Sequence, residues 1–189
     1  MSLKHLDSQI EDLGTQAASI QKRGARTRDI VNSDRTLSDV GKREKLDEAA
    51  AQTKASLSDL RARHNELVTK KRESLERELF GLKGTASDPN QLIAYRDAQD
   101  RAAKLPDSAA ATALLASANQ SGDRTLAAAV VARALREVGP AGVMGSNGWR
   151  NVVNTYAERY PSDGDKLKDL LNLPSREAAR ALFVYMSPF

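Results

Sequence analysis

The chain has 189 residues, of which 29% are charged and only 4% aromatic, so it is hydrophilic and poor in large core side chains. It contains no cysteine, which excludes disulfide bonds, thiolate metal sites and a cysteine nucleophile. The net charge of +4 comes from 29 Lys and Arg against 25 Asp and Glu, with the two signs intermixed as on solvated helix faces. No segment approaches the roughly 18 apolar residues of a membrane-spanning helix, so we expect no membrane partner.

The residues up to Val31 predict an amphipathic helix with one narrow apolar seam. Its apolar residues recur in steps of three and four, at Leu3, Leu6, Ile10, Leu13, Ala17 and Ile20. Gly14 and Gly24 each cost about 1 kcal/mol relative to alanine in a helix, so we expect the end of this helix to fray. Turn residues follow at 32–36 and predict a bend.

A second, longer helix is predicted for residues 37–80, a stretch with no proline and with Gly41 as its only glycine. Thr36 or Ser38 would cap its start. Its seam has the 3.5-residue period of a helix that pairs along one face, and consists of Leu46, Ala50, Thr53, Leu57, Leu60, His64 and Leu67. Residues 1–80 are therefore predicted to form a helical hairpin with coiled-coil character.

The seam of this hairpin is thinly filled, because alanine, threonine and histidine occupy positions where large apolar side chains would pack. The longer helix would also outrun the shorter one, leaving part of its seam uncovered. We therefore expect further helices to complete the hairpin, either from copies of the chain or from another protein. The candidate partner-binding residues are Leu3, Leu6, Ile10, Leu13, Leu57, Leu60 and Leu67.

Residues 81–88 predict a hinge, and residues 89–189 predict a small alanine-rich helical domain. All six prolines follow residue 88, and all eight aromatic residues lie at or after Phe80. Helices are expected at about 89–104, 106–119, 124–138, 149–160, 163–171 and 175–186, with a flexible glycine-rich connection at 139–148. The side chains expected to fill this core are Trp149, Tyr156, Tyr160, Phe183 and Tyr185.

No pattern in the chain predicts catalysis. His5 and His64 have no second ligand at metal spacing on their helices, and His64 falls on the seam, where a polar residue sets register. No glycine-rich segment matches a phosphate-binding loop, and no nucleophile motif is found. We therefore expect no catalytic residue, no metal and no cofactor, and we predict that the chain is not an enzyme.

Two segments are candidates for contact with a partner. The first is a basic patch that crosses the bend of the hairpin, formed by Lys22, Arg23, Arg26, Arg28, Lys42 and Arg43. These cations either complement the C-terminal end of the first helix or face phosphates or carboxylates of a partner. The second is the apolar segment 181–189, with Phe183, Tyr185 and Phe189, which either packs into its own domain or docks on another protein.

Two stretches resemble helical proteins encoded among the virion structural genes of actinobacterial tailed phages. Leu37-Ser38-Asp39-Val40-Gly41-Lys42-Arg43 is similar to the start of their long charged helix. The run from Ala113 to Val130, followed by Gly148-Trp149 and Tyr156, is similar to their second half. The resemblance implies a virion or assembly role near the major capsid protein, and it brings no catalytic residues with it.

These observations predict an all-α protein with a long N-terminal hairpin and a small C-terminal helical domain. The predicted function is a non-enzymatic, capsid-associated minor capsid protein that stabilises the shell, assembles in the host cytoplasm and resides in the virion. Its expected partners are copies of itself and the major capsid protein or other virion subunits. The alternatives are a scaffolding protein or assembly chaperone, a head–tail connector component, a nucleic-acid-binding module that uses the basic patch, and a host-side adaptor without a viral role.

Overall fold

A computed structural model describes residues 3–82, 88–138 and 147–189, and for residues 174–183 it describes the backbone alone. The described residues form seven α-helices and no strand, which confirms the all-α prediction with a long N-terminal hairpin and a smaller helical part. The helices are α1 Leu3–Ser33, α2 Asp39–Phe80, α3 Pro89–Ala103, α4 Ser108–Ser121, α5 Arg124–Val138, α6 Asn147–Arg159 and α7 Pro161–Val184. They belong to two compact units, Met1–Lys71 with Ser175–Phe189, and Arg72–Pro174.

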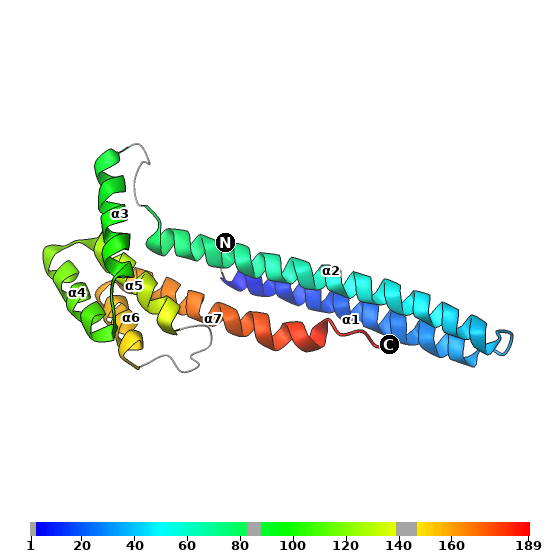
Figure 1. Ribbon diagram of the computed structural model, residues 1–189. Helices are drawn as coiled ribbons and strands as arrows, with labels where there is room; N and C mark the ends of the chain where they lie inside the picture. Colours follow the sequence, from blue (N-terminus) through cyan, green and yellow to red (C-terminus); the bar gives the residue numbers. More distant parts are fainter. Residues whose placement is uncertain (1–2, 83–87, 139–146) are drawn as a thin grey trace. The chain divides into compact units, whose positions relative to one another are not determined.

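The first unit is built on the hairpin, in which α1 and α2 lie side by side (Figure 1). Ser38 caps α2, because its Oγ accepts a hydrogen bond from the Gly41 backbone N–H at 3.2 Å. Val31 and Val68 are buried in this unit although the predicted seam did not include them, and Leu67, which it did include, is half-buried. The other buried apolar residues of the unit are members of the predicted seam: Leu6, Ile10, Leu13, Ala17, Leu57 and Leu60. The 3.5-residue spacing therefore placed these side chains on the correct face.

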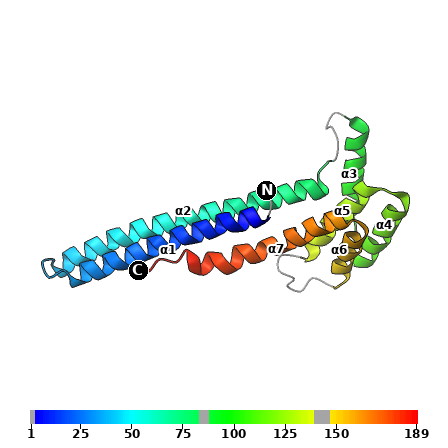
Figure 2. The same cartoon turned by 180° about the vertical axis from the view of Figure 1, so that it is seen from behind.

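The expectation that this seam needs a partner helix is wrong in the first unit, because the end of the same chain covers it. The last turn of α7 and the residues after it run beside α1 (Figures 1 and 2). Val184 and Tyr185 pack against the cluster of Leu13, Ala17, Leu57 and Leu60. Small residues on α1 leave the space that this segment occupies, so the gap in the seam is filled from within the chain.

The second unit is a helical cluster centred on α5, which packs against α3, α4 and α6. α5 is buried without interruption from Leu126 to Val131, since neighbours surround it. Three aspartates cap its helices with side-chain bonds to backbone N–H groups: Asp88 to Asn90, Asp107 to Ala110 and Asp123 to Leu126. Trp149 and Tyr156 are buried in this core, as predicted, and the last turns of α2 add Leu75 and Leu79.

The chain divides at different points from those predicted. The final turns of α2, after Lys71, belong to the second unit, and Ser175–Phe189 belong to the first. The two helices expected at 163–171 and 175–186 are a single helix, α7, which continues through Pro174. The unit boundary nevertheless falls directly after that proline. Most of the predicted hinge (83–87) and of the glycine-rich connection (139–146) lies outside the described residues.

None of the helices that the structure describes is long and apolar enough to cross a bilayer.

Candidate functional site

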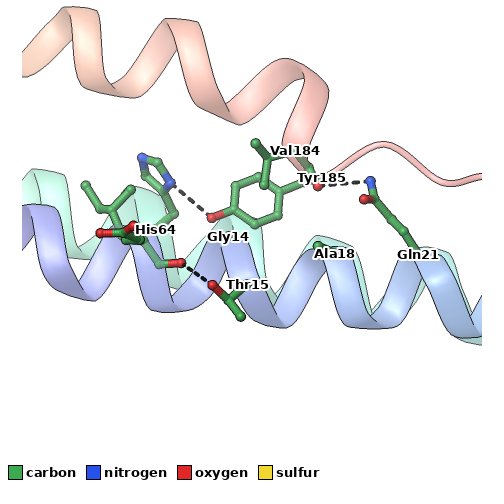
Figure 3. A pocket seen from close by; sticks show the side chains of 9 residues that line it. Gly14, Thr15, Ala18, Gln21, His64, Val184 and Tyr185 are labelled. Carbon is green, nitrogen blue, oxygen red and sulfur yellow. Dashed lines mark hydrogen bonds between the residues drawn. The ribbon is translucent and has the colours of Figure 1, made fainter.

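Four long-range hydrogen bonds in the first unit hold the tail, which we define as residues 184–189. Its receptor is the tail groove, formed by Gly14, Gln21 and Gly24 of α1 and by Thr53 and His64 of α2. Figure 3 shows the tail running alongside α1, with Tyr185 lying between His64 and Gln21. The groove therefore joins segments more than 100 residues apart in the sequence.

Hydrogen bonds in the tail groove are directed mainly at the backbone of the tail. Gln21 Nε2 donates to the carbonyl oxygens of Val184 at 3.1 Å and Met186 at 2.8 Å. Arg28 Nη1 donates to the carbonyl oxygen of Pro188 at 2.7 Å. Because the residues after Tyr185 are not helical, their carbonyls have no i+4 donor, and α1 supplies donors in its place.

One tail side chain is bound by a specific polar contact. A hydrogen bond of 3.1 Å joins Nδ1 of His64 to the hydroxyl of Tyr185, and the two rings meet edge to face with centroids 5.8 Å apart. His64 is fully buried, and burial also raises the pKa of Tyr185 above its ordinary value. The seam histidine is therefore a binding partner of the tail, a role that its position in the sequence did not reveal.

The two glycines of α1 serve different purposes in this groove. A Cβ atom on Gly24 would lie 3.0 Å from the Phe189 ring, 3.2 Å from the Thr53 hydroxyl and 3.3 Å from the Pro188 ring. A Cβ atom on Gly14 would meet only Val184, at an ordinary 3.9 Å. Close approach of the tail therefore favours glycine at residue 24, where any side chain would push against Phe189, Thr53 and Pro188. The helix α1 does not end there but continues to Ser33.

Beside the tail, a cavity of about 380 Å³ remains between the helices. It is lined by Ile10, Glu11, Gly14, Thr15, Ala18, Gln21, His64, Val184 and Tyr185. The cavity is open on one side and mixes apolar with polar lining, so the tail does not fill the space between α1 and α2 completely.

The predicted partner-binding residues lie in different environments, from fully buried to exposed. Leu6, Ile10, Leu13, Leu57 and Leu60 are buried within the chain itself, and so are not available as a docking surface. Leu3, Leu67 and Tyr185 are half-buried, and Phe189 remains 39% exposed. The Phe183 side chain lies outside the described part. Tyr185 packs on the hairpin, so its assignment to the core of the C-terminal domain is wrong.

The basic patch lies at the bend, within what we call the hairpin end, residues 22–45. Lys22, Arg23, Arg26 and Arg43 are exposed there. The two other predicted members make internal contacts: Arg28 binds Pro188, and Lys42 Nζ donates to the Asn32 carbonyl oxygen at 3.0 Å. The six predicted residues therefore lie in the same region, but Arg28 and Lys42 form hydrogen bonds within the chain.

The hairpin end accounts for the entire net charge of the chain. It holds eight Lys and Arg against four Asp and Glu, whereas all other residues hold 21 of each sign. Two large aliphatic side chains, Ile30 and Val40, are 67% and 68% exposed in this same segment. Hydrogen bonds from Thr36, and then the charges of Lys45 and Lys42, hold the pKa of Asp34 below its ordinary value.

A buried polar cluster in the second unit was not predicted from the sequence. Asp163, in the first turn of α7, accepts hydrogen bonds on Oδ2 from the Tyr156 hydroxyl and from Arg124 Nη2, each at 2.9 Å. The Arg124 guanidinium also lies 5.0 Å from the centre of the Tyr160 ring. Tyr160 in turn donates to Asn119 Oδ1 at 3.3 Å. The cluster ties α4, α5, α6 and α7 together.

The electrostatics of this cluster match a structural role. Burial, followed by the bond to Asp163, raises the pKa of Tyr156 above its ordinary value of 10.0, so this phenol stays neutral. The bond to Asp163 raises the pKa of Arg124, which stays charged. The cluster has five members, and its hydrogen bonds join residues as far as 41 positions apart, so no short motif encodes it.

No protein-family model, curated protein or solved structure matches the chain. Among the residues that the structure describes, no group of three or more His, Asp or Glu side chains is placed to hold a metal ion.

Proposed function

We propose that the chain is a non-enzymatic structural protein that docks on neighbouring protein subunits through its hairpin end, as a capsid-associated component of a tailed-phage virion. One observation carries the docking part of this proposal: a single segment of 24 residues holds the whole net charge of the chain and the exposed side chains of Ile30 and Val40. The virion part rests on the resemblance of residues 37–43 and 113–130 to virion proteins of such phages.

The chemistry of the hairpin end favours a protein partner. Burying the exposed parts of Ile30 and Val40 gains free energy at roughly 25 cal/mol per Å² of apolar surface. Phosphate groups offer no such surface, whereas an apolar hollow on a protein does. Protein interfaces combine an apolar core with a polar rim and are enriched in arginine over lysine, and five of the eight cations here are arginines.

The tail changes where the partner should bind. Residues 184–189 of the same chain cover the seam between α1 and α2, so this seam no longer supports an assembly role by itself. The tail touches the hairpin end at Gly24 and Arg28, but it leaves Ile30, Val40, Lys22, Arg23, Arg26 and Arg43 exposed.

Mass spectrometry of purified precursor shells and mature particles tests the virion assignment. A capsid-associated protein is retained in mature particles at a fixed ratio to the major capsid protein. Abundance in precursor shells with loss on maturation would identify a scaffolding protein instead. Absence from both kinds of particle would refute the virion role.

Incorporation of variants into particles tests the hairpin end itself. Ile30→Ser with Val40→Ser should reduce incorporation at least tenfold, and so should Arg23→Glu with Arg26→Glu. Ile93→Ser is the matched control, because Ile93 is also 64% exposed but lies on α3 in the other unit. Equal incorporation of all these variants would show that the hairpin end does not dock.

A nucleic-acid-binding module remains the second candidate, and the excess of cations at the hairpin end favours it. A 30-base-pair DNA duplex is a direct probe, since binding through about six exposed cations should weaken steeply as salt rises. No aromatic residue precedes Phe80, so base stacking would not contribute at this end. Absence of salt-dependent duplex binding would exclude this candidate.

A further inference from the structure

We propose that the tail groove is a peptide-docking site and that, when copies of the chain assemble, it receives residues 184–189 of a second copy. This inference deepens the proposed assembly role and rests on it, but it concerns the residues that bind the tail, of which only Gly24 and Arg28 also belong to the hairpin end. The tail that occupies the groove within one chain defines the chemistry of the ligand: a non-helical peptide with an aromatic side chain at its second position and Pro-Phe at its end.

The contacts in the groove are those of peptide recognition. One side-chain amide, Gln21, binds two carbonyls that are two residues apart, and Arg28 binds a third. These contacts read the backbone and not the sequence of the tail. Sequence is read at two points, where His64 binds the Tyr185 hydroxyl and where Gly24 admits the rings of Pro188 and Phe189. In peptide binding, hydrogen bonds to the main chain usually give affinity, and contacts with alternate side chains give specificity.

A tail from a second copy would make identical contacts, because its sequence is identical. The difference between the two arrangements is the effective concentration of the tail, which assembly raises for a second copy by bringing it close. Residues 175–189 are joined to the other unit by a single helix, α7, which passes from one unit to the other after Pro174. Exchange of an identical element between copies is a low-cost route to association.

The tail also leaves apolar surface exposed when it lies in the groove. Met186 is 57% exposed and Phe189 39% exposed, and the cavity beside Tyr185 is not filled. A neighbouring copy that contributes its tail brings its own surface alongside these side chains. Met186 and Phe189 are therefore where that copy would add contacts beyond those of the exchanged tail.

A peptide-binding measurement tests the groove in the full chain. The probe is a fluorescent peptide of residues 184–189, blocked at both ends, and the receptor is the full chain with Tyr185→Ala to weaken its own tail. Fluorescence anisotropy should show binding at least tenfold tighter to this variant than to the unchanged chain, because the intact tail competes. Equal affinity for both receptors would mean that the peptide binds elsewhere and would overturn the proposal.

Variants of the groove in the weakened-tail chain decide whether the contacts above are responsible. Gln21→Ala removes two hydrogen bonds and should lower affinity at least tenfold. Gln16→Ala is the matched control, since Gln16 is an exposed glutamine on the same helix, and it should leave affinity unchanged. A probe with phenylalanine in place of Tyr185 should bind several-fold more weakly. Helical circular dichroism confirms that each receptor is folded, and unchanged binding by Gln21→Ala overturns the assignment.

Complementary chains test exchange between copies. One chain carries an intact tail and a disabled groove (Gln21→Ala with Gly24→Val), and the other carries an intact groove and Tyr185→Ala. Analytical ultracentrifugation of the mixture should show a one-to-one complex that neither chain forms alone. If the mixture sediments as two separate monomers, the groove serves its own chain only and the second-copy proposal fails. Incorporation into particles through the hairpin end would be unaffected by that result.

Discussion

Replacing Asp163 with alanine removes the acceptor that holds together the polar cluster of the second unit. Its side chain is 6% exposed and accepts hydrogen bonds from Tyr156 and Arg124, each at 2.9 Å. After the substitution, the Tyr156 hydroxyl is buried without that acceptor, whereas the Arg124 side chain, 48% exposed, can bind water. The two donors therefore contribute unequally to the loss.

The expected loss of unfolding free energy is about 3 kcal/mol. A hydrogen bond to a charged group contributes roughly 1.5–3 kcal/mol, and a buried hydroxyl left without a partner costs roughly 1–3 kcal/mol of desolvation. The exposed half of the ion pair with Arg124 adds at most about 1 kcal/mol. Asp163→Asn keeps an acceptor oxygen for Tyr156 but loses the charge, so we expect a smaller loss of about 1–2 kcal/mol.

Urea unfolding followed by tryptophan fluorescence measures this loss in the correct unit. Trp149 is the single tryptophan of the chain and is buried in the second unit, so its emission reports that unit. Asp165→Ala is the matched control, because Asp165 lies two residues along the same helix but is 83% exposed and pairs loosely with Lys168 at 3.5 Å. It should change stability by less than about 0.5 kcal/mol. If Asp163→Ala and Asp165→Ala unfold at the same urea concentration, the cluster does not stabilise the unit and the reasoning is refuted.

Three further predictions use the same chain. Burial raises the pKa of Tyr156, so as pH rises its phenol ionises in the unfolded chain before it does so in the folded chain. The unfolding free energy reported by Trp149 should therefore be constant up to about pH 10 and fall above it. Tyr156→Phe should make that fall smaller. Gly122 ends α4 with a φ of 72°, so Gly122→Ala should cost about 1 kcal/mol in the same urea assay, and Gly122→Asn less. Gly24→Val should release the tail and make chymotrypsin cleave faster after Tyr185. Gly14→Ala is the control, because a Cβ atom fits at residue 14: it should stabilise α1 by up to about 1 kcal/mol and leave the cleavage rate unchanged.

Local patterns were sufficient for most of the helices, because each depends on residues close in the sequence. The seam of α1 and α2 followed from apolar spacing, and Ser38 and Asp88 could be recognised as caps from the residues that follow them. The basic patch was also predictable, since a bend between two helices brings their adjoining ends together. These features need only the period of a helix and the position of a turn.

The tail groove and the Asp163 cluster could not be predicted in the same way. His64 and Tyr185 are 121 residues apart, and Arg124 and Asp163 are 39 apart, so no local rule brings either pair together. Gly24 looked like a weak point of α1, yet it is the residue that admits Pro188 and Phe189. Pro174 suggested the end of a helix, but α7 continues through it, and only the packing changes there.

The sequence alone determined that this protein is all-helical, that residues 3–80 form a long hairpin and that the hairpin end is basic, because helix period, capping and charge are local properties. Only the tertiary structure decided what completes the hairpin. Apolar side chains of a seam are buried by whichever segment fits the space beside them, and here small residues on α1 admit the end of the same chain.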